Sequence, residues 1–71
     1  HYQERIFFAK KAVELAPRDP NALRSLAWAW WISGDEAKAI DTYKKLKEID
    51  PLAFQQVLDR VLEIKKAIIG D

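Results

Sequence analysis

The chain has 71 residues, of which 49% are hydrophobic and 32% are charged, and its net charge is +1 at pH 7. Acidic and basic residues are mixed throughout, which argues against a nucleic-acid or anionic-membrane surface, because both attract clustered positive charge. The sequence holds no cysteine, so it forms neither a disulfide nor a thiolate metal site. No apolar run approaches the ~20 residues of a membrane span, and no signal-peptide pattern is present. The compartment stays open, with the cytoplasm slightly favoured.

The first expected helix covers residues 3–16, where apolar residues recur three and four positions apart. Pro17 ends this helix, because proline disfavours helical geometry at the residue before it. Phe7 falls on the polar side, where it either packs against a neighbouring helix that this chain lacks or touches another copy of the chain. The expected apolar face consists of Tyr2, Ile6, Ala9, Val13 and Ala16, flanked by Phe8, Ala12 and Leu15.

The second expected helix covers residues 20–33. Asp19 offers a side-chain acceptor to free backbone N–H groups at the start of this helix. Pro20 suits the first helical position, which needs no N–H donor. Gly34 ends the helix, because glycine tolerates the left-handed backbone that follows many helix ends.

Two more helices are expected, over residues 36–49 and 52–69. Asp35 caps the first of them, and Asp50-Pro51 repeats the Asp-Pro start signal before the second. The last helix carries two apolar stripes, of which one packs on the preceding helices and the other has no obvious partner. The first stripe is Val57, Val61, Ile64 and Ile68, and the second is Leu58, Leu62 and Ile69.

The stretch from Pro20 to Pro51 carries a spaced set of apolar residues. The set reads Leu23-x2-Leu26-Ala27-x2-Trp30, then Ala39-x3-Tyr43, then Pro51. This spacing resembles the tetratricopeptide repeat, whose pattern is W-x2-L-G-x2-Y…A-x3-F…P. Leu23 stands at the family's first Trp and Ala27 at its Gly, so each keeps the size that the position needs. The Gly34-Asp35 pair lies where the family turns between its two helices.

A sequence similarity between two parts of the chain strengthens this resemblance. Repeats of the family are 34 residues long, and Pro17 and Pro51 are separated by the same interval. Two helices that share spacing, charges and a terminal proline are poorly explained by chance. At this offset the identical pairs are Ile6 and Ile40, Lys10 and Lys44, Lys11 and Lys45, and Glu14 and Glu48.

The resemblance implies an all-α fold in which antiparallel helix hairpins stack as a short right-handed solenoid. One full repeat would cover about residues 20–53, with half a repeat before it and a terminal helix after it. Residues 1–71 then form a single domain, expected to be a fragment of a longer array. An engineered repeat is a further origin to consider.

The resemblance also implies a binding surface, because the first helix of each repeat lines the concave groove of such arrays. The groove residues it implies are Asn21, Arg24, Trp28, Trp31 and Ile32, joined by the exposed stripe residues Leu58 and Leu62 of the last helix. Some members grip a terminal carboxylate with Lys and Asn, whereas this chain offers only Arg24 and Asn21 there. An apolar or amphipathic helical peptide is therefore the better-matched ligand. The competing interpretation is that the Trp rings pack against the last helix and cover Leu58 or Leu62.

The residues give no sign of catalysis. His1 is the only histidine, and none of the hydroxyl side chains has a base at a motif spacing. No glycine-rich phosphate loop, metal-ligand set or cofactor motif is present. We therefore expect a non-enzymatic scaffold without cofactor or metal, which binds a partner protein or peptide. The alternatives are a self-assembly element that forms dimers or domain swaps, and a regulatory appendage of a larger enzyme.

Overall fold

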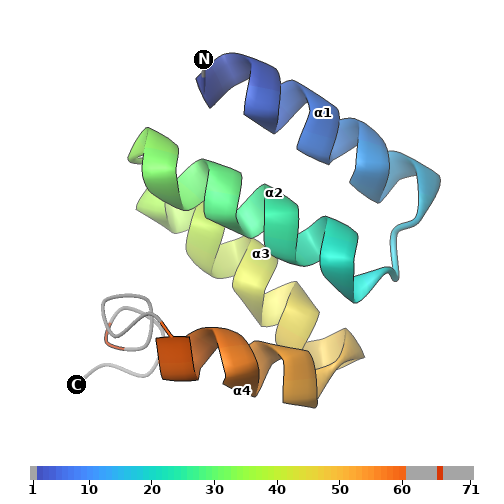
Figure 1. Ribbon diagram of the computed structural model, residues 1–71, viewed down its shortest axis with the longest axis vertical. Helices are drawn as coiled ribbons and strands as arrows, with labels where there is room; N and C mark the ends of the chain where they lie inside the picture. Colours follow the sequence, from blue (N-terminus) through green and yellow to red (C-terminus); the bar gives the residue numbers. More distant parts are fainter. Residues whose placement is uncertain (1, 61–65, 67–71) are drawn as a thin grey trace.

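The computed structural model describes residues 2–60 and residue 66, with the side chains of Tyr2, Leu58 and Arg60 left aside. The regular elements in this part of the chain are all helices, which confirms the predicted all-α class. Successive helices run in opposite directions and follow one another along the longest dimension of the molecule (Figure 1). Residues 61–69 of the last expected helix lie outside the described residues. The helices are α1 (Tyr2–Leu15), α2 (Pro20–Ser33), α3 (Glu36–Ile49) and α4 (Pro51–Arg60).

An aspartate caps the start of α2, α3 and α4, as the sequence predicts. Asp19 Oδ1 accepts a hydrogen bond from the backbone N–H of Asn21 at 2.9 Å. Asp35 Oδ1 accepts one from the backbone N–H of Lys38 at 3.2 Å, and Asp50 Oδ1 accepts one from the backbone N–H of Ala53 at 3.1 Å. Each cap satisfies a backbone donor that the helix itself leaves free, typically stabilising the helix by about 1 kcal/mol.

The turn between α2 and α3 depends on Gly34. Its φ of 95° lies in the left-handed region, which side chains with a Cβ adopt only with strain. The Gly34 N–H donates to the carbonyl of Trp31 at 3.2 Å, and the Asp35 N–H donates to that of Trp30 at 3.0 Å. These two bonds form the paired closure of a Schellman motif. The chain therefore reverses sharply and lays α3 back against α2.

The main core lies between α2, α3 and α4. Its fully buried members include Ala27 and Ala39, which are small enough to let α2 and α3 approach closely, and Tyr43, the largest of them. Thr42 is a buried polar residue of α3, and its hydroxyl donates to the Lys38 carbonyl at 2.8 Å. The buried cluster consists of Leu23, Ala27, Ala39, Tyr43, Leu46, Phe54 and Val57.

The α1 helix is covered along the apolar face expected for it, and the apolar residues flanking that face are exposed. Ala9 is buried and Ile6 and Val13 are half-buried, whereas Phe8 and Leu15 are exposed. The physical reason is that α1 packs against α2 but has no comparable contact with a second described helix. One neighbour covers one strip of a helix, and the residues flanking that strip stay in solvent.

Trp30 joins three helices through its indole ring. The ring is half-buried and packs against the main core, as its place in the apolar stripe predicts. Lys10 of α1 lies over the ring at 5.2 Å from its centroid, and Lys38 of α3 lies over it at 4.5 Å. Each cation–π contact at such a site contributes about 0.5–1 kcal/mol. Trp30 thus ties α1 and α3 to α2.

The stability of the fold should fall between pH 10 and pH 12 because of Tyr43. Burial raises the pKa of this phenol from 10.0 to about 12, and the positive charge of Arg24 opposes part of that rise. Between these values the unfolded phenol has lost its proton while the folded one retains it, so rising pH favours unfolding. We expect a loss of about 2 kcal/mol by pH 12, measured by urea unfolding at stepped pH.

The matched control is Tyr43→Phe, which keeps the buried ring and removes the titrating group. The two proteins differ only in this hydroxyl group, so the difference between the two pH profiles isolates Tyr43. Parallel profiles from pH 9 to pH 12 would contradict the raised pKa.

Candidate functional site

The side chains of three consecutive residues of α2, Ala27 to Ala29, lie in three different environments. Successive residues of an α-helix are about 100° apart around its axis. Ala27, at 0% exposure, belongs to the core shared with α3, and Ala29, at 4%, lies at the contact with α1. Trp28 falls between these two covered sides and is 42% exposed. The side of α2 that carries Trp28 is therefore its open side.

Two polar residues of the predicted site lie on the exposed surface of α2 towards its start. The Arg24 guanidinium donates to Asn21 Oδ1 at 2.9 Å, and both residues are exposed. Arg24 precedes Trp28 by four positions, so the two side chains share one face of the helix. Asn21, Arg24 and Trp28 together form what we call the outer face of α2.

The remaining predicted site residues are less accessible or lie outside the description. Trp31 is half-buried and packs against the main core, and Ile32 is half-buried as well. The side chain of Leu58 and the whole of Leu62 lie outside the described residues. The competing interpretation, in which the Trp rings cover those two leucines, therefore stays a prediction. Of the predicted set, the structure brings Asn21, Arg24 and Trp28 together as an exposed group.

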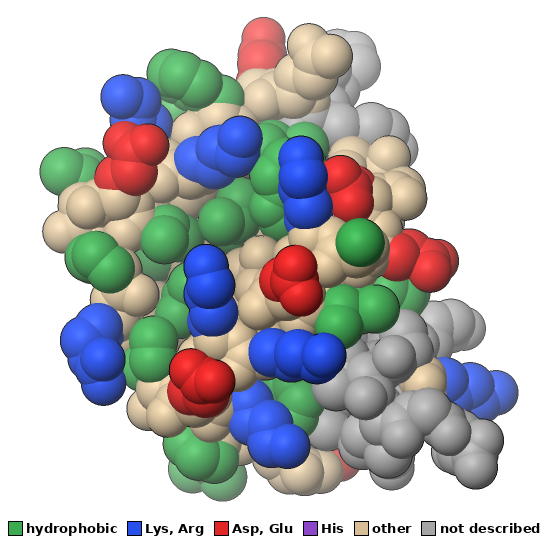
Figure 2. Space-filling view, turned by 180° about the vertical axis from the view of Figure 1, so that it is seen from behind, with side chains coloured by type: hydrophobic (Ala, Val, Ile, Leu, Met, Phe, Trp, Pro, Cys, Tyr) green, Lys and Arg blue, Asp and Glu red, His purple; other side chains and the backbone are tan. Residues whose placement is uncertain are grey.

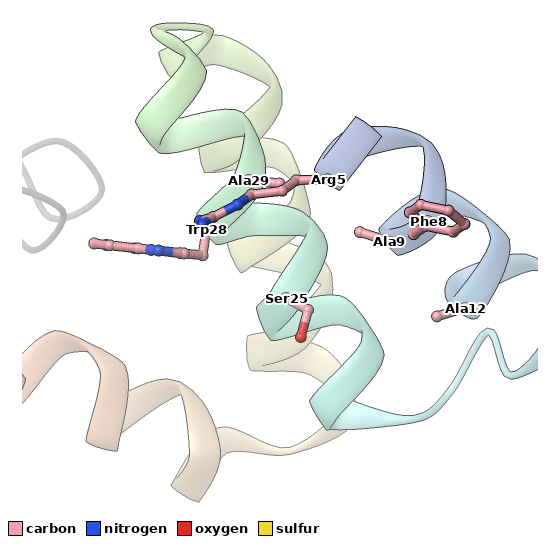
Figure 3. A pocket seen from close by; sticks show the side chains of 7 residues that line it. All are labelled: Arg5, Phe8, Ala9, Ala12, Ser25, Trp28 and Ala29. Atoms are coloured by element: carbon pink, nitrogen blue, oxygen red, sulfur yellow. The ribbon is translucent and has the colours of Figure 1, made fainter. Parts of the chain in front are cut away.

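A hollow that the sequence reasoning missed lies between α1 and α2 (Figure 3). Its volume is about 480 Å³ and its walls are mainly apolar. The Arg5 side chain extends from α1 towards α2, and the Trp28 ring extends from α2 away from α1 (Figure 3). Alanine and serine side chains form part of the lining, beside the larger Arg5, Phe8 and Trp28. The lining residues are Arg5, Phe8, Ala9, Ala12, Ser25, Trp28 and Ala29.

Charges of both signs surround the apolar side chains on the surface. On the face in Figure 2, Lys and Arg side chains lie beside Asp and Glu. Two ion pairs of this kind are Lys11 with Glu14 at 3.9 Å and Lys38 with Asp35 at 3.7 Å. Within residues 2–60, no three His, Cys, Asp or Glu side chains come together as a metal site. The described helices include none that is long and apolar enough to cross a bilayer.

Comparison of the chain with protein-family profiles, with curated proteins and with solved structures yields no match. The arrangement of helices and the exposed groups described above are therefore the basis for a functional proposal.

Substitution of Trp30 should cost far more stability than substitution of Trp28. Trp30→Ala removes a half-buried ring together with its contacts to Lys10 and Lys38, and we expect a loss of about 3 kcal/mol. Trp28→Ala removes a ring with a large exposed fraction, and we expect about 1 kcal/mol or less. Chemical denaturation of the two variants measures both values. Equal losses of about 3–5 kcal/mol would mean that Trp28 is a core residue.

Proposed function

We propose that this chain is a non-enzymatic protein-interaction module that binds an amphipathic helix of a partner protein along the outer face of α2. We further propose that its helices form a segment of a tetratricopeptide-type solenoid, with the outer face of α2 in the concave groove. No bond is made or broken at this site. Affinity arises from burying the Trp28 ring, and Arg24 orients the partner.

The proposed solenoid is supported by the order in which the helices pack. Each helix lies against the next one along the chain, and consecutive helices are antiparallel. The Gly34 turn sits at the place where the repeat pattern requires a reversal. The residues that match the pattern at Leu23, Ala27 and Tyr43 are all buried between helices. These observations agree with a stacked hairpin, in which each unit contacts only its neighbours.

The exposure of Trp28 is the single observation that carries the binding proposal. Tryptophan is a large residue that is highly buried on average in monomeric proteins. Here its ring remains 42% exposed on the open side of α2. Tryptophan and arginine are the residues most enriched among the anchors of protein interfaces. A Trp with an Arg on one exposed helix face is thus typical of a binding surface.

The chemistry of the outer face favours a helix that has one apolar stripe and polar edges. The indole provides a broad apolar contact, which suits side chains spaced three and four residues apart on a partner helix. Arg24 lies about one helical turn before Trp28 and Asn21 about two turns before it. The guanidinium and amide groups of these residues suit an acidic or amide residue at the partner's edge. The mixture of contacts matches the apolar centre and polar rim of known interfaces.

Self-assembly is the second candidate function, and the exposed apolar residues of α1 favour it. Phe8 is 66% exposed, and Phe7 and Leu15 are exposed beside it. Light scattering separates the two candidates, because a strict monomer at high micromolar concentration removes self-assembly as the function. The outer face of α2 would remain available for a partner in that case.

The binding proposal is tested with helical peptides selected against the full chain from a displayed library of amphipathic sequences. We expect Trp28→Ala to weaken the Kd of selected peptides about 30-fold, which corresponds to the roughly 2 kcal/mol that an interface anchor contributes. Arg24→Ala should weaken it less, because Arg24 lies at the polar edge. Isothermal titration calorimetry measures each Kd.

The matched control is Phe7→Ala, which removes another exposed aromatic ring from α1, at a position that does not line the hollow. This variant should change the Kd by less than about threefold. Peptides whose affinity is unchanged by Trp28→Ala, or reduced equally by Phe7→Ala, would refute the outer face of α2 as the binding surface.

A further inference from the structure

We propose that Lys10 and Lys38 form a modification site on Trp30, at which acylation of the two lysine amines loosens α1 and α3 from α2. The acyl donor is a thioester, an activated form of a carboxylic acid. We call the three side chains the Trp30 junction. The inference concerns the contacts between helices of this chain, so it does not rest on the binding function proposed above.

The Trp30 junction brings together side chains from three helices. The Lys38 ammonium lies 4.5 Å from the centroid of the indole ring, and the Lys10 ammonium lies 5.2 Å from it. Indole is the side-chain ring that attracts a cation most strongly, because the face of the ring carries negative charge. Trp30 is half-buried, and partial desolvation strengthens this attraction. The two positive charges therefore contribute to the contacts that α2 makes with α1 and α3.

The same kind of contact recurs between α3 and α4. Lys47 of α3 lies over the Phe54 ring of α4, at 5.7 Å from its centroid. Each of the main helix contacts within residues 2–60 thus includes a lysine over a ring of the neighbouring helix. The lysines come from α1 and α3, and the rings come from α2 and α4. Lysine charge is concentrated at Trp30, where two lysines share one ring.

The contact between α1 and α2 has little buried apolar area to compensate for a lost charge. Ala9 and Ala29 are buried there, and each contributes only a methyl group. Hydrophobic stabilisation scales with the apolar area removed from water, so a contact built around alanines depends more on its other interactions. We therefore expect the attraction between Lys10 and Trp30 to be a sizeable part of what holds α1 on α2.

Both lysines are accessible to an acyl donor. The Lys38 side chain is 59% exposed, and Lys10 is exposed as well. In the reaction the neutral ε-amine attacks the thioester carbonyl carbon and forms an N–C bond. The C–S bond breaks, and the thiolate leaves with the proton that the nitrogen gives up. The resulting amide is uncharged, so it loses the attraction to the indole. At position 38 it also loses the ion pair with Asp35, whose Oδ2 lies 3.7 Å from the lysine Nζ.

The test places Nε-acetyl-lysine at chosen positions of the full chain by genetic code expansion. Acetyl-lysine at positions 10 and 38 together should lower the Tm by about 8 °C, because two cation–π contacts are lost. Lys10→Arg with Lys38→Arg keeps both positive charges and should leave the Tm within about 3 °C.

Acetyl-lysine at positions 44 and 45 is the matched control. Lys44 and Lys45 are exposed on α3, and neither lies over an aromatic ring of the described residues. The control should change the Tm by less than about 3 °C.

Three further measurements assign the loss to the indole. In a Trp30→Leu chain the same two acetyl groups should lower the Tm by less than about 3 °C, because no ring remains for the lysines. In the unmodified chain, nuclear magnetic resonance should show the ε-methylene protons of Lys10 and Lys38 upfield of those of Lys44, because protons above an aromatic ring are shielded. Acetyl-lysine at position 10 alone should make hydrogen exchange of the α1 amides about threefold faster.

Three results would overturn the proposal. The first is a loss of Tm at positions 10 and 38 that is no larger than the loss at positions 44 and 45. The second is an equal loss in the arginine variant or in the Trp30→Leu chain, since the charge or the ring would then not be its cause. The third is that the ε-methylene protons of Lys10 and Lys38 match those of Lys44. This last comparison needs no substitution, so it decides the matter where Trp30→Leu does not fold.

Discussion

The packing of α2 between two helices is the constraint on which the rest of the structure depends. Alanines at this helix allow both neighbours to come close, with Ala27 towards α3 and Ala29 towards α1. Packed helix axes lie about 8–10 Å apart depending on the side chains at the contact, so small residues allow α1 and α3 to pack closely on α2. Two covered sides leave one open side, and the residue between the two alanines is Trp28. Its exposure is thus a consequence of how its neighbours are buried.

The local features of the fold could be predicted from the sequence because their causes are local. The three aspartate caps, the ends of α2 and α3 and the reversal at Gly34 each depend on a few adjacent residues. The apolar stripe through Leu23 and Ala27 also follows from spacing alone. The starts of α1 and α4 also depend on adjacent residues, and each lies within one residue of the expected position.

The degree of burial could not be predicted in the same way, because it depends on how many neighbours a helix has. Phe8 and Leu15 belong to an apolar region of α1, and the spacing of apolar residues alone does not give how much of each side chain is exposed. Trp31 was expected on the binding surface, and its half-buried ring also packs against the core. The hollow between α1 and α2 has the same origin. Its only signal in the sequence is the similarity between α1 and α3 at an offset of 34 residues, which pairs Ala9 and Ala12 with buried residues of α3.

The most direct measurement of the open side of α2 uses Trp30→Phe with Trp31→Phe, which leaves Trp28 as the only indole in the chain. Aromatic rings remain at both substituted positions, so circular dichroism should report an unchanged helix content. An exposed Trp28 predicts red-shifted emission that acrylamide quenches efficiently. Blue-shifted emission protected from acrylamide would mean that the third side of α2 is covered, and a binding surface on that side would be contradicted.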